Sequence, residues 1–280
     1  MYKSINAWSV PASESFEAMF RSVAKAGFTA IELNIDEIGS SKHSLSMQDG
    51  QAIYDHIRAL SRQFNLPVCS ISTSLYGSCS LGSRNPDECR KGQNLLRKQL
   101  ECARELGADG ILVVPGGISP AVSPAEAYAI SAATIRALIP EIMVAGIKVG
   151  LENVWNGFFL TARDMCDFID QFKCPLIGAY FDVGNVAVFS YSEHWIDALG
   201  SRIFKIHVKD YRRSSWFSGY FANLLEGSID WPAVAKALSR VGYTGSLTAE
   251  LDQIPACPEL LYHMTSEALD YIIAQSQTGQ

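Results

Sequence analysis

Short runs rich in apolar and β-branched residues alternate along the chain with longer stretches in which apolar residues recur every three or four positions. The first pattern predicts β-strands and the second predicts amphipathic helices. The strand-like runs span residues 4–10, 30–35, 67–73, 110–114, 148–154, 176–182, 203–209 and 246–251. The helical stretches span residues 13–26, 48–64, 86–106, 124–145, 161–172, 191–199, 231–241 and 258–274. The pattern therefore predicts eight consecutive strand-then-helix units.

Local signals at the helix ends support these boundaries. Ser123 is followed by proline and, three positions later, by Glu126, which is the pattern of a capping box with proline in the first turn. Asp230 is the expected N-cap of the helix that follows it. Pro140 is expected to bend the helix over residues 124–145.

Eight such units in 280 residues imply a (β/α)8 TIM barrel, an α/β fold in a single domain spanning residues 1–280. The strands carry apolar residues at consecutive positions, as buried parallel strands do. A doubly wound open sheet is the alternative, but no Gly-rich phosphate loop follows the first strand. The longest irregular segment, residues 210–229, follows the seventh strand, and at this length we expect a functional loop or a lid.

Composition and charge exclude several classes of protein. Apolar residues make up 48% of the chain and charged residues 19%, which excludes a disordered chain. The net charge of −6 disfavours nucleic acid as a partner, because phosphate-binding proteins usually carry a basic excess. No apolar run of about 18 residues occurs and the start lacks a long apolar stretch, so neither a membrane span nor a signal peptide is expected. The seven cysteines are odd in number and lack C-x-x-C spacing, which favours reduced thiols and a cytoplasmic protein.

Each of the last four predicted strands ends with an ionisable residue. These residues are Glu152, Asp182, His207 and Glu250. Because the C-terminal ends of barrel strands face the active site, we expect the four side chains to converge on one point. Three carboxylates at one point would repel one another without a cation. The four residues therefore predict a site for one divalent metal ion, for which their oxygen and nitrogen donors suit Mn²⁺, Mg²⁺, Co²⁺ or Zn²⁺.

The motifs around these residues resemble a known family. They are the runs GLENVW, FDVGN, HVKD and TAEL. The segment LEGSIDWP at residues 225–232 resembles a GEG-x-[IV]-DW signature before the last helix but one. Together these motifs resemble the sugar phosphate isomerase/epimerase group of the xylose-isomerase-like barrel superfamily. The resemblance is specific for the superfamily and says little about the substrate.

The resemblance implies an enzyme in which the four residues hold one divalent ion. In the ketose 3-epimerases of the group, the glutamates that match Glu152 and Glu250 also act as the acid/base pair. Epimerisation beside a carbonyl needs a proton removed from one face and returned to the other, while a cation stabilises the enediolate. An aldose–ketose isomerase would return the proton to the neighbouring carbon. The implied substrate is a small sugar or sugar phosphate, and a homo-oligomer stays open because no feature determines the number of subunits.

The chain departs from the ketose 3-epimerase pattern at two positions. Asn185 stands three residues after the Asp ligand, where those enzymes have His, and Phe158 stands six residues after the first Glu ligand, where they have Glu. Arg213, six residues after the His ligand, matches their substrate-binding Arg. Arg213 follows the seventh strand, where barrels often bind phosphate, but a solvated basic turn is an equally open interpretation. Asn185 and Arg213 are both candidate substrate-binding residues.

Four further residues are weaker candidates for substrate binding. Lys209 could polarise the carbonyl or pair with a carboxylate such as Asp210. Glu226 could hold the signature loop or accept a hydrogen bond from the histidine ligand. Glu32, on the second strand, could bind sugar hydroxyls or form an ion pair inside the barrel. Trp8 could form a wall of a sugar pocket or pack in the core.

Three other functions stay open at this point. Metal-dependent dehydration of a keto-sugar or keto-inositol would use the same residues. An abasic-site endonuclease shares the superfamily, but its three-metal site is rich in His, and this chain has Asn185 where that chemistry supplies one. A non-enzymatic sugar-binding barrel is disfavoured by the intact set of metal ligands.

Overall fold

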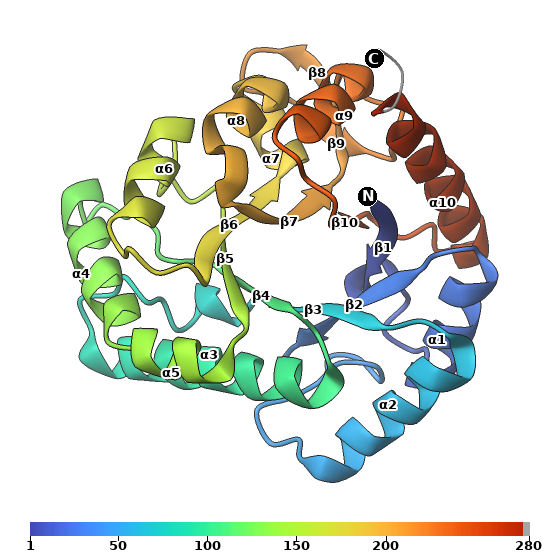
Figure 1. Ribbon diagram of the computed structural model, residues 1–280, viewed down its shortest axis with the longest axis horizontal. Helices are drawn as coiled ribbons and strands as arrows, with labels where there is room; N and C mark the ends of the chain where they lie inside the picture. Colours follow the sequence, from blue (N-terminus) through green and yellow to red (C-terminus); the bar gives the residue numbers. More distant parts are fainter. Residues whose placement is uncertain (277–280) are drawn as a thin grey trace.

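Eight parallel strands close into a barrel in the computed structural model, which describes residues 1–276 (Figure 1). The strands are β1 (Tyr2–Asn6), β2 (Ala30–Ile35), β3 (Val68–Thr73), β4 (Gly110–Val113), β5 (Lys148–Glu152), β6 (Ile177–Asp182), β7 (Ile203–Val208) and β10 (Ser246–Ala249). All neighbouring strands pair in parallel, and β10 closes the barrel against β1. The predicted (β/α)8 barrel is confirmed, and the closed strand order rules out the open sheet.

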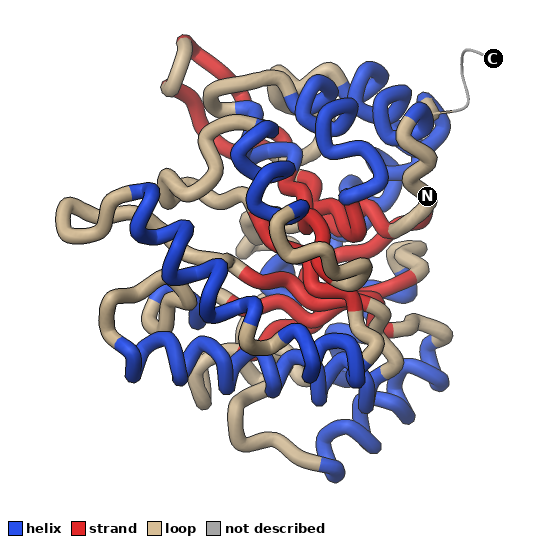
Figure 2. Tube along the Cα trace, turned by 60° about the vertical axis from the view of Figure 1, so that its left-hand side comes forward, coloured by secondary structure: helices blue, strands red, loops and turns tan. Residues whose placement is uncertain are grey.

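The helices form a ring around the barrel (Figures 1 and 2). They are α1 (Phe16–Lys25), α2 (Gln51–Phe64), α3 (Pro86–Leu106), α4 (Pro124–Arg136), α5 (Ile139–Ala145), α6 (Ala162–Asp170), α7 (Val183–Ala187), α8 (Ser192–Leu199), α9 (Trp231–Arg240) and α10 (Pro258–Gln275). Three 3₁₀ turns add η1 (Ala7–Ser9), η2 (Leu75–Gly77) and η3 (Gly200–Arg202). The main apolar core lies between this ring and the outer face of the strands.

Both predicted N-caps are confirmed. The Ser123 side chain accepts the N–H of Glu126, and Asp230 caps α9. The Glu126 carboxylate does not complete the expected capping box but forms an ion pair with Arg84. The long helix predicted after Ser123 is divided into α4 and α5, which are bent by 48° with Pro140 in the first turn of α5. Within residues 1–276 no single helix is long and apolar enough to span a membrane, and only this bent pair passes that test when its two helices are counted together.

The inside of the barrel is polar, contrary to the prediction of strands that are apolar at consecutive positions. In β2, the aliphatic residues Ile31 and Leu33 belong to the core outside the barrel, whereas Glu32 and Asn34 bond to side chains of other barrel strands. Buried polar side chains also occupy the matching positions of other strands: Ser4, Asn6, Ser70, Ser72, Tyr180, Lys205, His207 and Thr248. The prediction was wrong for these strands because only their outer face packs against helices. The inner face is available for polar chemistry.

Residues 210–229, which we expected to be irregular, contain an antiparallel hairpin. Its strands are β8 (Asp210–Ser215) and β9 (Ser218–Ala222), and Tyr211 lies opposite Phe221. The ring centroids of these two residues are 5.7 Å apart, so an aromatic pair stabilises the hairpin across its strands. Figure 2 shows the hairpin projecting from the body of the barrel. The short helix α7, directly after β6, was also not predicted.

Candidate active site

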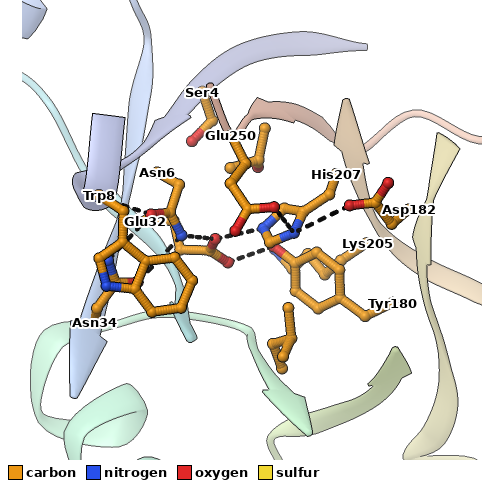
Figure 3. Close-up of polar contacts among 12 residues, drawn as sticks. Ser4, Asn6, Trp8, Glu32, Asn34, Tyr180, Asp182, Lys205, His207 and Glu250 are labelled. Atoms are coloured by element: carbon orange, nitrogen blue, oxygen red, sulfur yellow. Dashed lines mark hydrogen bonds and ion pairs between the residues drawn. The ribbon is translucent and has the colours of Figure 1, made fainter. Parts of the chain in front are cut away.

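The four residues predicted to hold a divalent ion converge at the C-terminal end of the barrel, where Figure 3 shows the polar contacts around His207. One donor atom from each lies within 4.8 Å of the other three. His207 Nδ1 is 3.3 Å from Glu152 Oε1 and 3.6 Å from Glu250 Oε2. Its distance to Asp182 Oδ2 is 4.0 Å. The structure therefore brings together four side chains that come from four different strands or strand ends.

Asp182 is positioned by the strand register and by two asparagines. It lies opposite His207 in the pairing of β6 with β7. The Asn153 side chain donates to the carbonyl of Asp182 at 2.9 Å and accepts its N–H at 2.8 Å. Asp182 Oδ1 accepts the N–H of Asn185 at 2.7 Å, and the Asn185 side chain donates to the Asn153 carbonyl at 2.9 Å. Asn185 thus helps to hold Asp182 in place. Asn153 has the same role, although the sequence analysis did not identify it as a candidate.

Lys209 places a positive charge among these carboxylates. Its Nζ is 2.8 Å from Asp182 Oδ2 and forms an ion pair with Glu250 Oε2. Burial acts to lower the pKa of Lys209, but the charges of Asp182, Glu250 and Glu152 outweigh it and raise that pKa above its ordinary value. The ammonium group is therefore held in its charged form against two of the four candidate ligands.

The two candidate acid/base glutamates have opposite pKa shifts. Burial raises the pKa of Glu152 to about 7, and the charges of Glu250 and Asp182 add to this effect against the opposing effect of His207. Burial also acts to raise the pKa of Glu250, but the charges of Lys209 and His207 outweigh it and hold that pKa below its usual range. Near neutral pH Glu152 is therefore partly protonated while Glu250 is ionised. A proton donor and a proton acceptor at one site need this difference.

The donor set fits a divalent metal ion. Oxygen donors with one imidazole nitrogen suit Mn²⁺, Mg²⁺, Co²⁺ and Zn²⁺. Asp182 Oδ2 is buried and lies 2.8 Å from Lys209 Nζ and 4.0 Å from His207 Nδ1, so this charged oxygen faces the centre of the cluster, where an ion could bind it. Metal–ligand distances of about 2.0–2.3 Å place opposite donors a little over 4 Å apart, close to the spread of 4.8 Å found here. Small shifts of these side chains would let all four bind one ion.

We expect the affinity for Mn²⁺ to rise with pH up to and through about pH 7. Glu152 must lose its proton before it binds an ion, and its pKa is about 7. Below that pH the ion competes with at least one proton, so the affinity should rise by about tenfold or more per pH unit. Calorimetric titrations near pH 6 in two buffers of different ionisation enthalpy should show at least one proton released per ion. An affinity independent of pH between about 5.5 and 7.5 contradicts this expectation.

A cavity of about 570 Å³ lies beside the cluster, with Lys209 and Glu250 in its wall. Trp8 lines the same cavity, as do Tyr220 and Phe221 from β9. The other lining residues lie at the end of β9 or in the segments after β9 and β10: Ala222, Asn223, Glu226, Leu251, Asp252, Gln253 and Ile254. Its volume is in the range of small-molecule binding sites. Of the predicted substrate-binding residues, Trp8, Lys209 and Glu226 are thus at the cavity.

Glu32 does not line this cavity. Glu32 Oε1 is 2.6 Å from His207 Nε2, and its other carboxylate oxygen accepts the hydroxyl of Tyr180. Burial acts to raise the pKa of Glu32, but the charge of His207 and these hydrogen bonds lower it to about 2. We considered that Glu32 could bind sugar hydroxyls or form an ion pair inside the barrel, and the structure agrees with the ion pair. It also shows that the acceptor for the histidine is Glu32, so the idea that Glu226 accepts this hydrogen bond was wrong.

The structure does not bring Arg213 to the cavity either. Its guanidinium donates to the carbonyl of Ser190 at 2.9 Å and to that of Ala187. It also lies 4.7 Å from the centre of the Trp216 ring and 5.3 Å from that of Tyr191. These contacts tie the hairpin to the segment between α7 and α8. Arg213 lines a different cavity, of about 170 Å³.

Asp210 organises the loop that contains the sequence signature. Its buried carboxylate accepts the indole N–H of Trp231 at 2.8 Å, while Lys209 pairs with other carboxylates, so the suggested pairing of Asp210 with Lys209 was wrong. A Cβ atom on Gly227 would lie 1.9 Å from Asp210 Oδ1, so only glycine fits there. Gly227 and Trp231 of the signature thus hold the loop that carries Glu226 to the cavity.

Gly227→Ala is expected to lower the free energy of unfolding by about 2–3 kcal/mol, because the methyl group would displace the loop from Asp210. Urea-induced unfolding followed by circular dichroism measures this change. Gly77→Ala is the matched control, since a Cβ atom there meets nothing within 4 Å, and it should change the stability by less than about 0.5 kcal/mol. Equal stabilities for the two variants would contradict the proposed role of Gly227.

A family model described as xylose isomerase-like TIM barrel matches residues 20–267. The matched range includes all four residues of the cluster and the strands from β2 to β10.

Two relatives match parts of the chain. The 3-oxo-isoapionate decarboxylase of Pectobacterium atrosepticum is 28% identical over 112 residues, which are 38% of this chain and 40% of that protein. The ketose 3-epimerase of Arthrobacter globiformis is 26% identical over 198 residues, which are 65% of this chain and 63% of that protein. The chain therefore covers less than two thirds of the length of either relative.

Several solved structures have the same fold over almost the whole chain. L-Ribulose 3-epimerase superimposes with a TM-score of 0.79 at 18% identity, covering 99% of this chain and 95% of that one. D-Psicose 3-epimerase of Clostridium cellulolyticum H10 with D-tagatose has a TM-score of 0.78 at 15% identity, covering 99% of each chain. The IolI protein with a bound zinc atom has a TM-score of 0.81 at 14% identity, covering 100% of each chain. At these identities the likeness concerns the fold.

Proposed function

This chain belongs to the xylose isomerase-like TIM barrel family, and from that premise we propose that it is a divalent-metal-dependent epimerase or isomerase of a small sugar. One observation carries the proposal: Glu152 and Glu250, with opposite pKa shifts, lie in a cluster of four metal-binding side chains beside the cavity. The partial match to a ketose 3-epimerase supports the same reaction class. Proton transfer next to a carbonyl needs this pair of groups.

In the proposed mechanism the two glutamates exchange protons with the substrate. Glu250 lines the cavity and is ionised near neutral pH, so it takes the proton from the carbon beside the carbonyl. Glu152, the other carboxyl group of the pair, takes a proton from solvent and returns it to the carbon from the other side. A divalent ion bound by the cluster would polarise the substrate oxygens as a Lewis acid. Lys209, charged and in the cavity wall, orients the oxygen nearest to Glu250.

The charges around the cavity favour a sugar without phosphate. Glu226, Asp252 and Glu250 line it. Among the described residues that line it, Lys209 is the basic one, and it is already paired with two carboxylates. Arg213, the candidate phosphate ligand of the sequence analysis, binds main-chain carbonyls instead. Since a phosphate dianion would meet these carboxylates without a free basic side chain in the cavity wall, we propose an uncharged sugar as the substrate.

A free ketose is expected to have a kcat/KM on the order of 100-fold higher than its phosphate ester, because like charges at a binding site disfavour the complex strongly. Paired assays at constant ionic strength, with Mn²⁺ present, measure this ratio. The double variant Glu226→Gln, Asp252→Asn should narrow the gap, since it removes two of the carboxylates from the wall. Equal use of the two substrates by the parent protein would argue against an uncharged substrate.

A second candidate is decarboxylation of a 3-oxo sugar acid, which the match to the Pectobacterium atrosepticum decarboxylase favours. Loss of CO₂ and removal of a proton both leave negative charge next to a carbonyl, so one site can serve either reaction. The carboxylate of such a substrate would, however, meet the acidic wall of the cavity. Release of CO₂ from a 3-oxo sugar acid, with no proton exchange into ketoses, would favour this second candidate.

A proton-exchange screen tests the leading proposal. The full chain is incubated with Mn²⁺ in D₂O, together with free ketoses and aldoses in separate samples, and each sugar is followed by NMR. We expect deuterium at the carbon beside the carbonyl of one sugar, together with the signals of its epimer or isomer. A protein that binds Mn²⁺ and exchanges no proton in any of these sugars would overturn the proposal.

The remaining expectations belong to the same proposal. Mn²⁺ is the ion to test first, because the donor set is oxygen-rich. A cytoplasmic location agrees with the free thiols of all seven cysteines. The acidic cavity and the net charge of −6 argue against nucleic acid as a substrate. The proposal also includes that residues 1–280 form one domain.

A further inference from the structure

The two ring nitrogens of His207 face different partners. Nδ1 faces the cluster, 3.3 Å from Glu152 Oε1 and 3.6 Å from Glu250 Oε2. Nε2 faces the opposite way, toward Glu32 (Figure 3). It lies 2.6 Å from Glu32 Oε1. Because this carboxylate oxygen is an acceptor, Nε2 must carry the proton in their hydrogen bond. With the Nε2 proton held in this bond, Nδ1 is the nitrogen that can give up its proton and serve as a ligand.

Glu32 is held rigidly by residues of three other strands. It is fully buried, with no exposed surface. Besides His207, it accepts the Asn6 side-chain N–H at 2.6 Å and the hydroxyl of Tyr180. Asn6 is fixed in turn, because its Oδ1 accepts the N–H of Trp8 at 2.7 Å. The carboxylate therefore has one orientation, and that orientation presents an oxygen to the histidine.

We propose that Glu32 is a positioning residue for the metal site, which fixes the ring of His207 with Nδ1 directed at the other three ligands. This inference rests on the proposed function, because it assumes that the cluster binds a divalent ion. Glu32 is not among the four donors and does not line the cavity, so it acts only through His207. A negatively charged acceptor behind a histidine ligand sets its tautomer and makes the ring a stronger donor to the ion.

A purely structural role for Glu32 is less consistent with its surroundings. A buried carboxylate without a charged partner costs stability, and the neighbouring outward positions of β2 are occupied by Ile31, Leu33 and Ile35. The partner that compensates the charge of Glu32 is His207 itself, from the far side of the barrel. The contact with the candidate metal ligand His207 thus explains why an acidic residue occupies position 32.

Mn²⁺ titration of the full chain in competition with a chromophoric chelator tests this inference. Glu32→Gln keeps the size of the side chain and removes its charge, and Glu32→Leu also removes the acceptor. We expect Mn²⁺ binding to weaken by about 10-fold in the first variant and by up to about 100-fold in the second. Glu17→Gln is the matched control, since it makes the same chemical change on the exposed surface of α1, where Glu17 pairs with Arg21, and it should stay within about threefold of the parent.

A spectroscopic readout separates positioning from general loss of structure. In the ¹⁵N-labelled protein with Zn²⁺ bound, the parent should show His207 protonated at Nε2, and the Glu32 variants should show a changed or exchanging Nε2–H signal. His207→Ala reports on the metal site itself. If His207→Ala weakens Mn²⁺ binding but Glu32→Gln, with an unchanged circular dichroism spectrum, binds within twofold of the parent, the role of Glu32 is overturned. If His207→Ala leaves Mn²⁺ binding unchanged, the metal site of the proposed function fails, and this inference fails with it.

Discussion

Glu250→Gln is expected to slow the exchange of substrate protons with solvent by about 10³-fold at saturating Mn²⁺. Glutamine keeps the size of the side chain and one oxygen donor but cannot accept a proton at neutral pH. Glu250 lines the cavity, and its pKa is held below its usual range by Lys209 and His207 against the effect of burial. It is thus the ionised partner of the glutamate pair. Deuterium incorporation followed by NMR, with the variant loaded with Mn²⁺, measures the loss.

The control for this variant is a glutamate far from the cluster. Glu17→Gln makes the same chemical change on the exposed surface of α1, where Glu17 pairs with Arg21, and exchange should proceed at the parent rate. Metal content is measured in parallel, so that a lost ion is not mistaken for a lost base. Normal exchange in Glu250→Gln with full metal content would show that the proton acceptor is another group.

His207→Ala is expected to weaken Mn²⁺ binding by on the order of 100-fold or more and to lower the free energy of unfolding by about 3 kcal/mol. The first effect arises because the variant removes the nitrogen donor of the cluster. The second arises because the fully buried Glu32 loses the cationic partner that lies 2.6 Å away. Elemental analysis after dialysis and urea-induced unfolding measure the two effects.

The control for His207→Ala is the substitution of an exposed histidine. His56 lies on the outer surface of α2, and His56→Ala should change neither metal content nor stability by a measurable amount. If His207→Ala kept a full complement of metal, the cluster would not be the metal site. If it lost metal without losing stability, the contact between His207 and Glu32 would contribute less than the structure indicates.

The four residues of the cluster could be predicted from their positions along the chain. Glu152, Asp182, His207 and Glu250 each stand at or near the end of a strand-like run, and consecutive strands of a parallel barrel end at the same rim. Topology therefore determined which side chains would meet, without any distance being known. The distances and the opposite pKa shifts of the two glutamates could not be predicted, because they depend on burial and on the charge of Lys209.

The contacts of Glu32 and Arg213 could not be predicted from their positions along the chain. Glu32 was identified as a candidate, but its partner His207 lies across the barrel. A local sequence pattern cannot predict a contact between residues so far apart along the chain. Arg213 has the spacing of a substrate ligand, yet the β8–β9 hairpin, which was not predicted, directs it to the carbonyls of Ala187 and Ser190. In both cases the neighbour that matters is far away in sequence.

The sequence by itself determined the eight-unit barrel, most helix ends and the rim on which the cluster lies, because hydrophobic period, caps and strand order are local properties. Only the tertiary structure decided that the barrel interior is polar, that Glu32 lies behind His207 and that the cavity wall is acidic. Those features depend on which side chains meet across the barrel and over its rim. They arise from long-range packing, which makes the inner face of each strand available for chemistry while its outer face holds the fold together.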